Sequence, residues 1–66
     1  MYDYRLEYIC LIEFLMAYDD TEEWNLILRE CNLDFHESIK VLKIRLSKKE
    51  GDFYKDAYEV AKRIYK

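Results

Sequence analysis

Apolar residues recur along the last part of the chain with the spacing of a helix that is buried on one side. Between Asp52 and Lys66 they occupy positions i, i+1, i+4, i+5, i+7, i+8, i+11 and i+12, which form a wide stripe on a helix. Asp52 can cap the start of this helix. The pattern predicts a helix over residues 52–66, and Gly51 is expected to end the helix before it.

Two further segments repeat the helical spacing. Over residues 35–49 an apolar seam steps by four, three and four residues, and Asp34 can cap its start. Over residues 21–31 an inner stripe has similar spacing, and Asp20 can cap that helix. The two stripes consist of Phe35, Ile39, Leu42 and Leu46 in the first segment and Trp24, Ile27, Leu28 and Cys31 in the second.

The opening of the chain has two interpretations. Residues 2–8 alternate between apolar and polar, as in a half-buried strand, and residues 9–16 then form an almost unbroken apolar run. The sequence offers no second strand, so a strand here would have to pair across a dimer. A loose N-terminus is the third possibility. We favour a helix over residues 3–17 that is buried on more than one side.

These patterns predict an all-α protein, a compact bundle of about four short helices in a single small domain over residues 1–66. With 52% apolar residues, one glycine and no proline, the composition fits helices joined by short turns. Three other helices can cover only part of the first, so we expect a homodimer. The expected interface residues are Tyr4, Tyr8, Ile9, Leu11, Ile12 and Leu15.

The two cysteines bear on the compartment. Cys10 and Cys31 lie inside apolar runs, which favours two buried free thiols in a reducing cytoplasm; a single disulfide is the alternative. The first residues do not resemble a signal peptide. The apolar run of residues 9–16 is too short and too charged at its edges to span a bilayer. We therefore expect a cytoplasmic protein that does not enter the membrane.

Residues for catalysis or metal binding are few. Asp34, His36 and Ser38 are two positions apart, and residues i and i+2 do not face each other on a helix. Cys10, Cys31 and His36 lack the paired spacing of a zinc site. The acidic residues at 19–23 lack the alternating ligands and glycine of a calcium loop. The sequence predicts no enzyme, no metal and no cofactor.

The charges are strongly polarised along the chain. Residues 1–37 contain ten acidic and two basic residues, whereas residues 38–66 contain four acidic and nine basic residues. An acidic surface with aromatic anchors suits a basic site on another protein. The expected partner-binding residues are Met16, Tyr18, Asp19, Asp20, Glu22, Glu23, Trp24 and Glu30.

The function expected from this profile is non-catalytic protein binding by a small inhibitor or adaptor. Small, acidic, tyrosine-rich chains without reaction chemistry are typical of phage or mobile-element proteins that inhibit a host factor. Nucleic-acid binding is an alternative, because helices over residues 21–31 and 35–49 have the outline of a helix-turn-helix and the second is basic. Ser38 stands where that motif normally buries an aliphatic residue, and the acidic half of the chain would repel DNA.

Residues 11–42 also resemble a ubiquitin-associated (UBA) domain, a three-helix module. Met16-Ala17-Tyr18 matches the loop after the first helix, Asn32-Leu33-Asp34 matches the turn into the third, and Ser38-Ile39 matches the start of that third helix. The resemblance implies ubiquitin contacts at Met16, Tyr18, Val41 and Leu42. Ala17 stands in place of the family's loop glycine, and the segment over residues 52–66 lies outside the pattern.

Overall fold

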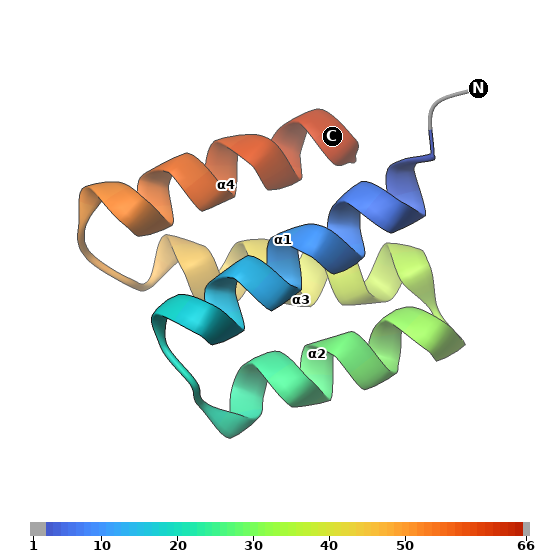
Figure 1. Cartoon of the computed structure of the whole chain (residues 1–66). Coiled ribbons are helices and arrows are strands. Elements are labelled where there is room, and N and C mark those ends of the chain that lie inside the picture. Colours follow the sequence, from blue (N-terminus) through green and yellow to red (C-terminus); the bar gives the residue numbers. More distant parts are fainter. Residues whose placement is uncertain (1–2, 66) are drawn as a thin grey trace.

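The computed structural model describes residues 3–65, which form a bundle of four helices (Figure 1). The helices are α1 (Tyr4–Tyr18), α2 (Glu22–Leu33), α3 (Phe35–Ser47) and α4 (Asp52–Ile64). The prediction of an all-α bundle of four short helices is confirmed.

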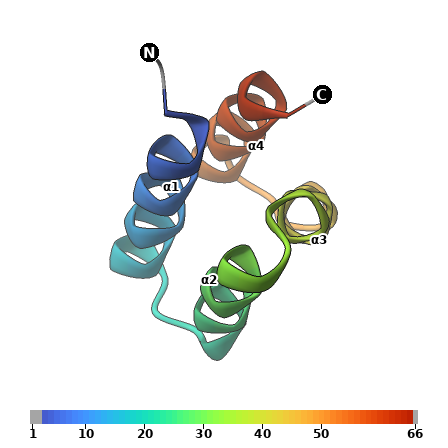
Figure 2. The ribbon, with the colours of Figure 1, turned by 90° about the vertical axis from the view of Figure 1, so that its right-hand side faces the viewer.

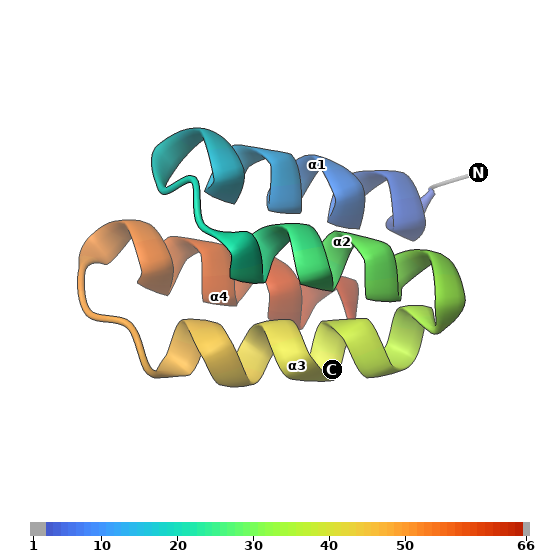
Figure 3. The ribbon, with the colours of Figure 1, turned by 90° about the horizontal axis from the view of Figure 1, so that it is seen from below.

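Each helix runs antiparallel to the next, and the four surround one core. Viewed along the bundle, α1, α2, α3 and α4 follow one another around a ring, and α4 closes it against α1 (Figure 2). The view from below shows the same alternation of direction (Figure 3). The first and last helices, far apart in sequence, are therefore neighbours.

Side-chain caps fix the starts of two helices. Oδ1 of Asp3 accepts hydrogen bonds from the backbone N–H groups of Arg5 at 3.1 Å and Leu6 at 3.2 Å. The helix therefore begins at Tyr4, and the strand interpretation is wrong for residues 4–8; residue 2 lies outside the described part of the chain. Oδ1 of Asp34 accepts from the N–H of Glu37 at 3.1 Å, which confirms the predicted cap of α3.

Other helix boundaries differ from the predicted ones by a few residues. Thr21, rather than Asp20, stands at the N-cap of α2 and makes no side-chain cap. The third helix ends at Ser47, whose hydroxyl donates to the carbonyl of Ile44 at 2.7 Å. Gly51, with φ of 120°, precedes α4 directly instead of ending α3, and Asp52 is the first helical residue. The predicted end at residue 66 lies outside the described residues.

The core takes apolar side chains from all four helices. It contains Tyr8, Ile12 and Leu15 of α1; Trp24, Ile27 and Cys31 of α2; Ile39, Leu42 and Leu46 of α3; and Ala57, Ala61 and Ile64 of α4. Ser38 is the buried polar residue among the described ones. The predicted stripes of α2 and α3 thus face the interior, with Leu28 and Phe35 partly buried against the core.

Burial corrects five expectations from the sequence. Tyr8, Ile12 and Leu15 were expected at a dimer interface, but all three are fully buried within the monomer because α2 and α4 cover α1 from two sides. Trp24, expected at a partner surface, is likewise fully enclosed. Cys10, expected to be buried, is exposed, whereas Cys31 is buried, and both are free thiols.

Among residues 3–65, none of the helices combines the length and the apolar character that crossing a membrane requires.

Candidate functional site

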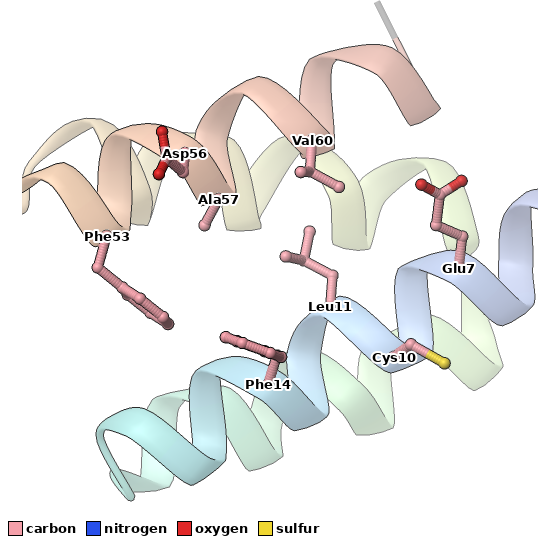
Figure 4. Close-up of a pocket in the computed structure, with 8 residues that line it drawn as sticks. All are labelled: Glu7, Cys10, Leu11, Phe14, Phe53, Asp56, Ala57 and Val60. Carbon is pink, nitrogen blue, oxygen red and sulfur yellow. The ribbon is translucent and has the colours of Figure 1, made fainter.

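An open groove of about 530 Å³ lies between α1 and α4 (Figure 4). Its lining is mainly apolar, with one carboxylate on each wall. The lining residues are Glu7, Cys10, Leu11 and Phe14 from α1 and Phe53, Asp56, Ala57 and Val60 from α4. A groove of this kind can hold apolar side chains of another molecule.

The two walls follow from the same helical spacing. On each helix the lining residues fall at i, i+3, i+4 and i+7, so each wall is one face of about two turns. Ala57, which is buried, leaves space in the α4 wall because its side chain is a single methyl group. Leu11 and Val60 face each other across the middle of the groove (Figure 4).

Stacked aromatic rings form one end of the groove. Phe14 stacks on Phe53 with ring centroids 5.7 Å apart, and Tyr18 stacks on Phe53 at 3.8 Å with an interplanar angle of 11°. Phe14 and Tyr18 nevertheless remain 65% and 61% exposed. Phe53 thus supports two aromatic side chains that offer most of their surface to solvent.

The charges at the groove are both negative. Glu7 lies toward the end opposite the aromatic rings, and Asp56 is on the α4 wall (Figure 4). Within residues 3–65, neither carboxylate has a basic partner within ion-pair distance, and no basic residue is part of the lining. The site therefore combines an apolar floor with unneutralised negative charge.

Two of the predicted partner-binding acids have partners inside the chain. The hydroxyl of Tyr54 donates to Oδ2 of Asp19 at 3.0 Å. Burial raises the pKa of that hydroxyl, and the neighbouring Asp19 carboxylate raises it further. Glu23 forms an ion pair with Lys49 at 3.7 Å, and Nζ of Lys49 also lies 5.4 Å from the ring centre of Trp24.

The remaining predicted partner-binding residues differ in their exposure and surroundings. Asp20 and Glu22 are exposed, and Met16 is half-buried against the core. Glu30 lines a smaller groove of about 210 Å³ between α2 and α3, together with Glu23. Tyr18 is the predicted residue that belongs to the aromatic end of the α1/α4 groove.

Of the expected dimer residues, three remain outside the fully buried core. Tyr4 is 51% exposed, and Ile9 and Leu11 are partly buried against the core. Among these, Leu11 lines the α1/α4 groove. The surface left for a second copy is therefore smaller than the sequence suggested.

Some residues of the two other sequence hypotheses are buried or have partners within the chain. Leu42, an implied ubiquitin contact, is fully buried, and Val41 lines the groove between α2 and α3. Lys43, one of the basic residues over residues 35–49, donates to the backbone carbonyl of Tyr65 at 3.1 Å. Lys49 pairs with Glu23, so two of the five basic residues between positions 40 and 49 have partners within the chain.

Sequence reasoning missed most of the α1/α4 groove. Cys10, Phe14, Phe53 and Asp56 were not among the predicted site residues, although each has the helical spacing of its wall. The signal that identifies them is the pairing of α1 with α4, which periodicity within one helix does not reveal.

In the part of the chain that the structure describes, no three histidine, cysteine or acidic residues are grouped closely enough to hold a metal ion. Comparison of the chain with protein-family models, with curated proteins and with solved structures finds no match. The groove geometry is therefore the basis for assigning a function.

Proposed function

We propose that the protein is a non-catalytic interaction module that binds another protein through the α1/α4 groove and acts as an inhibitor or adaptor. The observation that carries this proposal is the exposed Phe14 at an apolar groove, held against Phe53. Large aromatic side chains in apolar depressions are enriched among binding hot spots.

The stacked rings also lower the cost of binding. A side chain that is already fixed in the free protein loses little conformational freedom when a partner covers it. Tyr18 and Phe14 are both restrained by Phe53, yet both expose more than half of their surface. Such a preorganised surface supports binding better than mobile side chains would.

The charge pattern favours a protein partner over nucleic acid. Glu7 and Asp56 are the charged residues of the groove lining, and both would repel phosphate groups. An inhibitor of a host factor, the role expected from the composition, would act by covering a basic, apolar site on its target. In this proposal the groove, rather than the acidic cluster at residues 19–23, makes the central contact.

The test is a selection of binding peptides from a random library displayed on phage, with the immobilised full chain as bait. Selected peptides are then titrated against the variants Phe14→Ser and Leu33→Ser. Both substitutions replace an exposed apolar side chain by serine, but Leu33, 83% exposed at the end of α2, is not part of the groove lining. This makes the second variant a matched control.

We expect the affinity of selected peptides to fall at least about tenfold with Phe14→Ser, as for a typical hot spot, and to stay unchanged with Leu33→Ser. A library that yields no binders, or binders with equal affinity for both variants, would refute the proposed function.

A further inference from the structure

We propose that the occupant of the α1/α4 groove is an amphipathic helix of the partner protein, with lysine or arginine residues beside its apolar stripe, and not a second copy of this chain. This inference rests on the proposed function and adds the chemistry of the partner to it. Three observations support the inference: the helical spacing of the groove walls, the two carboxylates of the lining, and the contact between these carboxylates that a two-fold symmetric dimer would create.

The walls fit a third helix. A helix packs on other helices by placing its side-chain ridges into the grooves between theirs. Each wall here spans about two helical turns, about 10 Å, which matches anchors at i, i+3 or i+4, and i+7 of an incoming helix. The described residues form helices and short connections without any strand, so an extended peptide would find no sheet edge to pair with.

The negative charges of the groove favour basic residues beside the apolar stripe of that helix. Glu7 and Asp56 come from opposite walls and have no basic partner within residues 3–65 (Figure 4). An occupant without basic residues would cover two carboxylates and remove part of their hydration without compensation. A lysine or arginine on each side of the apolar stripe replaces that hydration by an ion pair.

The same charges disfavour a second copy. In a two-fold symmetric dimer, one patch faces the same patch of the partner. Because Glu7 and Asp56 are the charged residues of the lining, two apposed grooves would bring carboxylates together with no base between them. Like charges at an interface oppose association and so favour a different partner.

The test uses three synthetic helical peptides of about four turns that share one leucine stripe at i, i+3, i+4 and i+7. The residues beside the stripe are lysine in one peptide, glutamine in the second and glutamate in the third. Each labelled peptide is titrated by fluorescence anisotropy against the full chain, at low and at physiological salt. The same titrations use the double variant Glu7→Gln with Asp56→Asn, and the single variant Phe14→Ser.

We expect the lysine peptide to bind about fivefold more tightly than the glutamine peptide, as two exposed ion pairs allow, and the glutamate peptide to bind least. The difference should shrink as salt rises. The double variant should bind the lysine and glutamine peptides equally, without loss of affinity for the glutamine peptide. Phe14→Ser should weaken the binding of all three peptides.

Other outcomes separate this inference from the proposed function. Equal affinity for the three peptides, with loss on Phe14→Ser, would overturn the basic flank and leave the groove as a binding site. Library peptides that depend on Phe14 but lack a helical, basic pattern would likewise overturn the basic flank and leave the groove as a binding site. Light scattering over a dilution series tests for a second copy as the occupant. A dimer that persists on dilution, and that dissociates with Phe14→Ser but not with Leu33→Ser, would overturn the inference.

Discussion

The hydroxyl of Tyr8 lies 2.7 Å from Oγ of Ser38 in the interior of the bundle, between α1 and α3. Oγ of Ser38 in turn donates to the backbone carbonyl of Ile27 in α2 at 3.0 Å. Since a serine hydroxyl has one hydrogen, Tyr8 must be the donor to Ser38. A single chain of hydrogen bonds thus connects three helices and satisfies both buried hydroxyl groups.

This chain of hydrogen bonds predicts non-additive losses of stability. Tyr8→Phe should lower the free energy of unfolding by about 1 kcal/mol, and Ser38→Ala by about 1–3 kcal/mol because it leaves the Tyr8 hydroxyl buried without a partner. The double variant should lose less than the sum of the two. Urea denaturation measures all four proteins, with Tyr58→Phe as a control at a half-buried tyrosine. Additive losses would contradict the hydrogen bond.

The same burial predicts a loss of stability at alkaline pH. Burial raises the pKa of the Tyr8 hydroxyl far above its ordinary value of about 10. Above pH 10 the unfolded chain releases this proton and the folded chain retains it. The stabilisation is therefore complete below the unfolded pKa and declines with rising pH, by about 1.4 kcal/mol per pH unit, until the folded pKa is reached.

Denaturation at a series of alkaline pH values tests this linkage. Tyr8→Phe should flatten the decline, because the variant has no proton to release at this position. Tyr58→Phe should keep the wild-type slope. A Tyr8→Phe protein with the wild-type slope would mean that other groups, such as Tyr54, whose pKa is also raised, dominate the alkaline transition.

The helices were predictable because their signals are local. Asp34 precedes an apolar seam with 4-3-4 spacing, and in the structure the Asp34 carboxylate accepts a hydrogen bond from the N–H of Glu37. The first helix was harder, since its apolar residues lie on several sides. Its position between α2 and α4 explains the buried Tyr8, Ile12 and Leu15, whereas Leu6 and Phe14 remain exposed. Tyr8 fits the alternating pattern of a strand and is also a core residue of a helix, so its burial does not distinguish the two; the helix that begins at Tyr4 after the Asp3 cap does.

The candidate site was much less predictable than the fold. Trp24 has the spacing of an inner stripe, and as an aromatic residue beside the acidic surface it was expected to be a partner anchor; the structure shows that it is buried in the core. Phe14 and Phe53 are 39 positions apart, and no property of either segment indicates that their rings stack. A groove between two helices depends on which helices are neighbours, and that information lies in the tertiary arrangement.

The two stacked phenylalanines should differ in their importance for stability. Phe53 is half-buried and contacts Phe14, Tyr18 and Tyr54, so Phe53→Ala should cost about 1–3 kcal/mol. Phe14→Ala should cost about 0.5 kcal/mol, because Phe14 is mostly exposed. Denaturation curves of both variants, with Leu33→Ala as a surface control, measure the difference. Equal losses would place Phe14 in the core and remove it from the binding surface.

The two thiols should differ strongly in their reactivity. Cys10 is exposed in the groove and should be accessible to iodoacetamide in the folded protein. Cys31 is 1% exposed, and burial raises its pKa, so its alkylation should wait for unfolding and be at least about a hundredfold slower. Mass spectrometry after timed labelling measures both rates, and in the variant Cys10→Ser all labelling comes from Cys31. Rapid labelling of Cys31 would contradict the packing of α2.

Slower labelling of Cys10 in the presence of a bound peptide, with Cys31 unchanged, would locate that peptide in the groove.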